Sequence, residues 1–168
     1  PEGRDLEVDG SALGEPERSR LVDEDAAAAA AAGPGIQLDV TPPEPLPVPE
    51  PQEVASDDDW AVKAHNKNIE VVQVMNIINP VAAYIIKGFE EYGDRFSPVL
   101  QEEWADTQVQ LTAATTLYED CQKRMEAGEF DKKLFLDLEE TWQLLVKTGV
   151  AGVRTKSMVD SELAGFTS

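Results

Sequence analysis

The stretch SPVLQEEWADTQVQLTAATTLYEDCQKRMEAG, residues 97–128, predicts one long helix with both of its ends encoded in the sequence. Ser97 is a residue type that caps helix N-termini, and Pro98 takes the first helical position, where its missing N–H removes no hydrogen bond. Gly128 follows the helix as the residue type that most readily adopts the left-handed conformation at a C-terminus. Such a helix of about thirty residues is on the order of 45 Å long.

Apolar and small side chains recur along this helix at alternating spacings of four and three residues, the pattern of a helix in a bundle or coiled coil. This seam consists of Leu100, Trp104, Thr107, Leu111, Ala114, Tyr118, Cys121 and Met125. Periodicity and end signals predict helices at residues 58–78, 80–92, 98–127, 131–148 and 158–164. The expected fold is therefore all-α, a helical bundle of about four main helices.

Two of the expected boundaries rest on residues that usually interrupt helices. Asn79-Pro80 is expected to end one helix and start the next, because the residue before a proline is pushed out of the α region. The segment VAGVRTK, residues 150–156, is expected to be a glycine-containing connector. Ser157 and Asp160 would then cap a last short helix.

The first third of the chain differs in composition from the rest. Residues 1–59 carry 16 acidic and 3 basic side chains, a net charge of −13 out of −19 for the chain. Seven alanines at 26–32 make at most a marginal helix, and the alternating prolines at 42–51 favour an extended polyproline conformation. We expect residues 1–56 to form a disordered or extended acidic arm that precedes an α-helical bundle domain at 57–168.

The arm contains one short apolar run, which we expect to dock on a partner, in the manner of an added strand. Its apolar residues are Ile36, Leu38 and Val40. Trp60 stands where the first helix begins, and an exposed aromatic residue there is a candidate interface anchor. These four residues are the predicted partner-binding residues.

No residue pattern predicts catalysis, a metal site or a cofactor. His65, the only histidine, has no second ligand at a metal-binding spacing. The sequence contains no glycine-rich phosphate loop, nucleophile elbow or Cys-x-x-Cys motif. Cys121 lies on the apolar seam, so we expect a buried, inert thiol. The chain is expected not to be an enzyme.

The segment from Ile69 to Phe89 is apolar enough to raise the question of a membrane. It also contains Glu70 and Lys87, which a spanning helix tolerates poorly, so we expect it inside a bundle and not inserted in a bilayer. Asn76 and Asn79 lie in this segment and need hydrogen-bond partners if they are buried. They would either fix the register of the bundle or pair with another subunit.

Composition narrows the function without identifying it. The acidity argues against nucleic-acid binding, and a single cysteine cannot form an internal disulfide, so we expect an intracellular, cytoplasmic or organellar protein. A start at Pro1 is what a processed or truncated chain would show. The leading hypothesis is a non-catalytic structural or interaction subunit of a larger assembly, bound to other protein subunits through an apolar helical face and the arm. The alternatives are a free-standing acidic adaptor or chaperone-like module for a basic protein, and a helical subunit of an enzyme complex.

Overall fold

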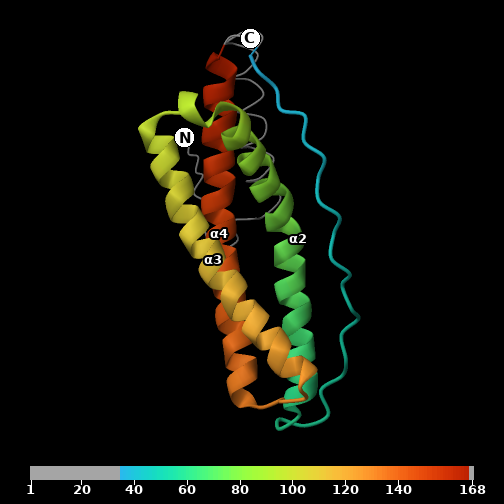
Figure 1. Cartoon of the computed structure of the whole chain (residues 1–168). Coiled ribbons are helices and arrows are strands. Elements are labelled where there is room, and N and C mark those ends of the chain that lie inside the picture. Colours follow the sequence, from blue (N-terminus) through green and yellow to red (C-terminus); the bar gives the residue numbers. More distant parts are fainter. Residues whose placement is uncertain (1–34, 167–168) are drawn as a thin grey trace, which may run out of the picture. The chain divides into compact units, whose positions relative to one another are not determined.

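The computed structural model of the chain describes residues 35–166. Within them lie three α-helices, α2 (Trp60–Tyr92), α3 (Pro98–Glu126) and α4 (Lys132–Gly165), and a 3₁₀ turn, η1 (Gly93–Arg95) (Figure 1). No β-strand occurs in this part of the chain, which confirms the all-α prediction. The described residues contain three α-helices, whereas about four main helices were expected. The expectations for residues 1–34, including the alanine helix, lie outside the described residues.

Helix α3 begins and ends where the sequence predicts. The Leu100 amide donates a hydrogen bond to Ser97 Oγ at 3.2 Å, which is an N-cap. At the other end Gly128 has a φ of +77°, and the amide of Glu129 donates to the carbonyl of Arg124 at 2.9 Å. The Gly128 amide donates to the Met125 carbonyl at 3.0 Å, which completes a Schellman motif.

The other two helices start at aspartate caps. The Val62 amide lies 3.3 Å from Asp59 Oδ1, and the Leu134 amide lies 2.9 Å from Asp131 Oδ1. A carboxylate in this position accepts from an unpaired N–H of the first turn and faces the positive end of the helix dipole.

The predicted break at Asn79-Pro80 is wrong, because α2 continues through Pro80. A proline inside a helix removes one hydrogen bond and crowds the carbonyl four residues earlier. On either side of it, Ile78 is 5% exposed and Ile85 is fully buried. Burying such side chains stabilises the continuous helix more than the single lost bond destabilises it.

The predicted connector at 150–156 and the separate helix at 158–164 are also wrong, because both belong to α4. Buried positions continue across this region with helical spacing, at Thr148, Gly152, Thr155 and Val159. A Cβ added to Gly152 would lie 3.5 Å from Val81 Cγ1, in ordinary contact. The local cost of glycine in a helix, about 1 kcal/mol, is outweighed by the packing of the face on which it lies.

The chain divides into two compact units, and every helix contributes to both. Of the described residues, unit 1 holds 35–42, 81–104 and 150–166, and unit 2 holds 43–80 and 105–149. In unit 1, Ser97 pairs with Glu162 and Glu103 pairs with Arg154, so α3 runs antiparallel to α4. In unit 2, Arg124 Nη2 lies 2.6 Å from Asp137 Oδ2 across the short turn that joins the same two helices.

The cores of the two units differ in composition. The core of unit 2 is mostly aliphatic, built from Ala64, Val71, Val72, Val74, Ile78, Ala114, Tyr118, Cys121, Leu134, Leu138 and Leu145. The core of unit 1 is built from Ile85, Phe96, Leu100, Trp104, Val159 and Leu163, with further aromatic side chains packed against it. There the Phe89 and Phe96 ring centroids lie 4.9 Å apart, and those of Phe96 and Phe166 lie 5.7 Å apart.

Six of the eight residues of the predicted seam of α3 are buried, namely Leu100, Trp104, Thr107, Ala114, Tyr118 and Cys121, and the other two, Leu111 and Met125, are half-buried and pack against the core of unit 2. Burial raises the pKa of the Cys121 thiol, as expected for a side chain in an apolar setting. The sequence analysis missed a threonine series on α4. Thr141, Thr148 and Thr155 are buried at seven-residue intervals, and each hydroxyl bonds the carbonyl four residues earlier.

Candidate functional site

The part of the arm that belongs to unit 2 lies along the first half of α2 and runs in the opposite direction (Figure 1). Leu46 bonds Asn76 of α2. Gln52 lies six residues after Leu46 in the arm, and it bonds Asn66, which lies ten residues before Asn76 in the helix. The chain then reverses at the turn Ser56–Asp59 and enters α2. The arm and the start of α2 therefore form a hairpin of an extended segment and a helix.

Two asparagine side chains hold the arm by its main chain. The Leu46 amide donates to Asn76 Oδ1 at 2.7 Å, and Asn76 Nδ2 donates to the Leu46 carbonyl at 3.0 Å. Asn66 repeats this arrangement at Gln52, with distances of 2.8 Å and 2.7 Å. Each side-chain amide thus uses its donor and its acceptor on a single arm residue. We call Asn66 and Asn76 the asparagine clamp.

His65 adds a third contact of the same kind. Its Nε2 lies 2.9 Å from the carbonyl oxygen of Glu50, and the ring donates this hydrogen bond when Nε2 carries the proton. The sequence analysis assigned no role to His65. The structure gives it a role in holding the arm.

The proline pattern of the arm determines which residues the clamp is able to bond. From residue 42 to 51 six of the ten residues are prolines, which have no N–H to donate, so the remaining donors fall on every second residue. An extended proline-rich segment has about three residues per turn, so positions six apart face the same way. Leu46 and Gln52 meet both conditions, since each has an N–H and the two are six residues apart.

In unit 1 the arm is held by its side chains. Ile36 and Leu38 pack against the aromatic core, and the Ile36 amide donates to the Leu163 carbonyl at 3.1 Å. Gly35 passes so close to α4 that an added Cβ would lie 2.7 Å from Ala164 Cα. Within the chain this run is not part of a strand, since it packs on helices and the Ile36 amide makes its one main-chain hydrogen bond to them; docking on a partner as an added strand stays a prediction.

The four predicted partner-binding residues are divided between the two units. Ile36 and Leu38 pack on unit 1, and Val40 is half-buried. Trp60 belongs to unit 2, where its ring centroid lies 5.8 Å from that of Phe135 and Lys63 Nζ lies 4.3 Å above it. Binding of an outside partner by these residues stays a prediction.

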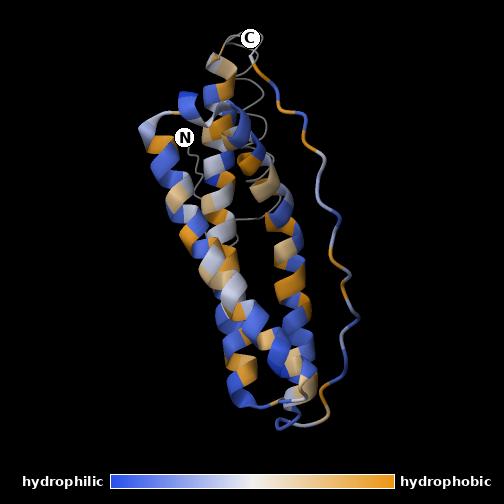
Figure 2. Ribbon diagram, in the orientation of Figure 1, coloured by the Kyte–Doolittle hydropathy of each residue, from blue (hydrophilic) through white to orange (hydrophobic). Residues whose placement is uncertain are grey.

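Most apolar side chains in the middle of α2 are buried or half-buried, and Ile86 is the one large apolar side chain of this helix that is exposed in the described chain. The segment Trp60–Arg95 is long and apolar enough to cross a membrane by length and composition, a test that core helices of soluble proteins also pass. Of its most apolar 18-residue stretch, 33% is buried, and apolar residues follow the middle of α2 in Figure 2. Ile86 is 43% exposed.

Asp137 is a carboxylate that is paired with two basic side chains of unit 2. Asp137 accepts hydrogen bonds from Arg124 and Lys133. Burial alone would raise the pKa of Asp137, but these bonds and the two positive charges outweigh it and lower the pKa.

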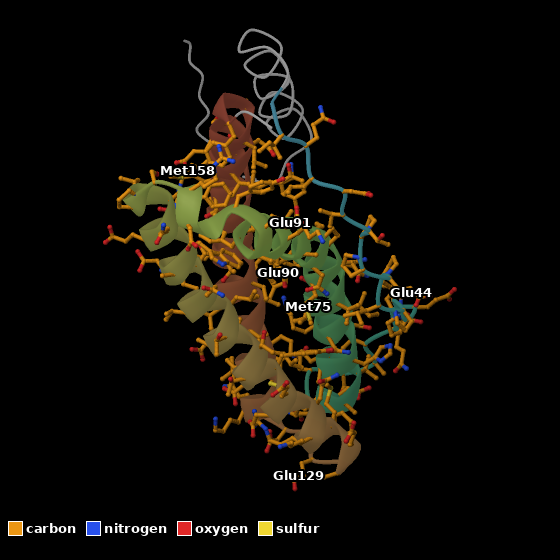
Figure 3. All side chains as sticks on the ribbon, turned by 45° about the horizontal axis from the view of Figure 1, so that its top comes forward. Glu44, Met75, Glu90, Glu91, Glu129 and Met158 are labelled. Atoms are coloured by element: carbon orange, nitrogen blue, oxygen red, sulfur yellow. The ribbon has the colours of Figure 1, made fainter. Side chains whose placement is uncertain are left out.

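The acidic side chains of the arm are exposed, and Glu44 points away from α2 (Figure 3). Among the described residues, no group of three or more His, Cys, Asp or Glu side chains is placed to hold a metal ion.

Comparison with protein families, curated proteins and solved structures finds no match to this chain. The asparagine clamp, the arm and the exposed apolar face of α2 are therefore the features from which a function has to be inferred.

Proposed function

We propose that this chain is a non-catalytic interaction subunit of a larger protein assembly and that it docks through the exposed apolar face of α2. The observation that carries this proposal is the exposure of Ile86, at 43%, within the most apolar stretch of α2, of which 33% is fully buried. Monomeric soluble proteins rarely leave large contiguous apolar surface in water, and such surface commonly marks an interaction site.

Ile86 is the residue of this face on which a test can be built. It is 43% exposed and lies on the same side of α2 as Ala82 and Ala83, which are four and three residues earlier. An exposed isoleucine flanked by small side chains leaves room for a partner's side chains to pack against the helix. Removing it from water on docking contributes about 25 cal/mol for each Å² of apolar area that is buried.

The experiment replaces Ile86 by glutamate in the full chain and measures the size and composition of the complex that it forms. The matched control is Val99→Glu, because Val99 is 66% exposed, belongs to the same unit and receives the same charge. We expect the Ile86 variant to lose the complex and the Val99 variant to keep it, with helix content unchanged in both. Retention of the complex by Ile86→Glu would reject the docking face.

A second candidate function is an acidic adaptor for a basic protein. It is favoured by the exposure of the acidic side chains at Glu44, Glu50, Glu53, Asp57 and Asp58. Association through exposed charges weakens as salt screens them. Binding to a basic test protein should therefore fall steeply between about 50 and 200 mM salt. Binding that is absent at low salt, or that does not change with salt, would reject this candidate.

A further inference from the structure

We propose that residues 43–51 of the arm, while they are held along α2, are a docking site for a partner domain that binds polyproline helices through an aromatic groove with a basic rim. We call residues 43–51 the proline ridge. The arm stays in place in this proposal, and its outward sides are the binding surface. The proposal does not rest on the docking face at Ile86, because the two surfaces share no residue.

The sequence of the proline ridge restricts its backbone at every position. Each residue from 43 to 51 is either a proline, with φ fixed near about −65°, or precedes a proline, which keeps it out of the α region. Both restrictions favour the polyproline II helix, and the segment is extended along α2 (Figure 1). A segment that is restricted in this way loses little conformational entropy when a partner binds it.

Helix α2 holds the ridge by its main chain and leaves its side chains exposed. The hydrogen bonds from the asparagine clamp and His65 all end on main-chain atoms of Leu46, Glu50 and Gln52. Every residue of the ridge remains exposed, and Val48 is 43% exposed. The clamp therefore fixes the position of the ridge and leaves its outward sides accessible to a partner.

One outward side of the ridge is apolar. A polyproline helix has three residues per turn, so residues three apart form a row. Leu46 and Gln52, which the clamp bonds, belong to the row that faces α2. The next row consists of Pro45, Val48 and Pro51. Aromatic-lined grooves bind apolar residues at this three-residue spacing in proline-rich ligands.

The remaining row is acidic. It consists of Glu44, Pro47 and Glu50. Both glutamates are exposed, and Glu44 points away from α2 (Figure 3). A groove that binds the apolar row meets these carboxylates at its edge. Lys or Arg side chains there attract them and Asp or Glu side chains repel them, so charge selects a groove with a basic rim.

The test titrates the full chain with purified domains that bind polyproline helices through an aromatic groove. One set of these probe domains has Lys or Arg at the rim of the groove, and the other set has Asp or Glu. We expect the first set to bind with dissociation constants on the order of 10–100 µM, and the second set to bind at least about tenfold more weakly. Isothermal titration calorimetry measures the affinities.

Val48→Ser tests the apolar row. Leu46→Ser is its matched control, because both side chains are partly exposed and both variants keep the backbone N–H. We expect Val48→Ser to weaken binding about five- to tenfold, since its side chain enters the groove. Leu46→Ser should weaken it less than about twofold, because Leu46 belongs to the row that faces α2.

Two double variants separate the ridge from a general attraction between acidic and basic proteins. Glu44→Gln with Glu50→Gln should remove the preference for the basic rim. Pro45→Ala with Pro51→Ala keeps every charge, yet it should weaken binding at least about fivefold, because it loosens the backbone and removes apolar contacts. Ile86→Glu should leave this binding unchanged, whether or not it abolishes the complex that tests the docking face.

A synthetic peptide of residues 41–54 shows whether α2 presents the ridge or masks it. The full chain should bind the probe domains about three- to tenfold more tightly than the peptide does, because its arm is already ordered. The Leu46 amide should stay protected from hydrogen exchange in the complex, since its bond to Asn76 is kept.

Three results would overturn the proposal. The first is absence of binding to every basic-rimmed probe domain at up to about 1 mM, while the chain keeps its helix content by circular dichroism. The second is equal weakening of binding by Val48→Ser and Leu46→Ser. The third is tighter binding of the peptide than of the full chain, or loss of protection of the Leu46 amide in the complex. Either form of the third result would show that α2 masks the ridge.

Discussion

The arm is held by different chemistry in the two units. In unit 1 the apolar side chains of Ile36 and Leu38 pack on an aromatic core, with one main-chain hydrogen bond. In unit 2 the side chains of α2 bond the main chain of the arm, and the arm's apolar side chains stay partly exposed, at 37% for Leu46 and 43% for Val48. The same extended segment is therefore held by side-chain burial in one unit and by main-chain hydrogen bonding in the other.

This difference separates the two contacts experimentally. Burial of apolar area depends on side-chain size and shape, at about 25 cal/mol per Å². A surface hydrogen bond contributes about 0.5–1.5 kcal/mol and depends only on the presence of the donor and the acceptor. Truncating side chains should weaken the contact in unit 1, and removing N–H groups should weaken the contact in unit 2.

The largest effect is expected from the contrast between the two cores. Phe96 is 3% exposed and contacts the rings of Phe89 and Phe166. Phe96→Ala should lower the free energy of unfolding by about 3–5 kcal/mol, because it leaves a cavity among aromatic rings. In unit 2 the matched change Cys121→Ala should cost about 1 kcal/mol, since it removes a single buried atom. Urea denaturation measures both, and equal losses would contradict the described contrast.

The next effect concerns the close approach of the arm to α4. Gly35→Ala places a Cβ 2.7 Å from Ala164 Cα, so the backbone has to move, at a cost of about 1–3 kcal/mol. Gly165→Ala is the control, because nothing lies within 4 Å of its added Cβ. Thermal unfolding should show a lower midpoint for the first variant only. An unchanged midpoint for Gly35→Ala would mean that the arm does not pass this close to α4.

A smaller effect on stability is expected from two substitutions of Leu46, one that removes its backbone N–H and one that shortens its side chain. Leu46→Pro removes the donor to Asn76 Oδ1 and should cost about 0.5–1.5 kcal/mol. Leu46→Ala keeps the donor and truncates a side chain that is 37% exposed, so it should cost less. Chemical denaturation of both variants gives the order. The reverse order would show that burial and not hydrogen bonding holds this part of the arm.

The smallest effect is a pH dependence at Asp137. Its folded-state pKa lies below the unfolded value of about 3.9, because the bonds from Lys133 and Arg124 outweigh the effect of burial. The stabilisation is therefore fully present above about pH 4 and is lost as the pH falls through the folded-state pKa. Asp137→Asn should flatten this part of the stability profile between pH 5 and pH 2. If the melting temperature of the variant depends on pH as steeply as that of the unmodified protein, Asp137 does not contribute to the pH dependence.

The sequence predicts α3 to within a residue because its end signals are local. Ser97, Pro98 and Gly128 act within a turn or two of their own positions. The breaks expected at Pro80 and before Ser157 fail for the opposite reason. Their outcome depends on packing between segments far apart in sequence, and that packing outweighs the local cost of proline or glycine.

The asparagine clamp is only partly visible in the sequence. Asn76 stands out as a polar residue in an apolar stretch, and the expected partners were the bundle or another subunit. Its partner is Leu46 of the same chain, thirty residues away. No periodicity links these positions, because the extended arm and the helix rise by different distances per residue. The six-residue spacing of Leu46 and Gln52 between prolines is the signal that was available.

Amide hydrogen exchange at Leu46 and Gln52 tests most directly whether α2 holds the arm by its main chain. Both amides should exchange at least about tenfold more slowly than in an unstructured peptide, and Asn76→Leu should remove the protection at Leu46. Exchange of both amides at the rate of an unstructured chain in the unmodified protein would contradict the account.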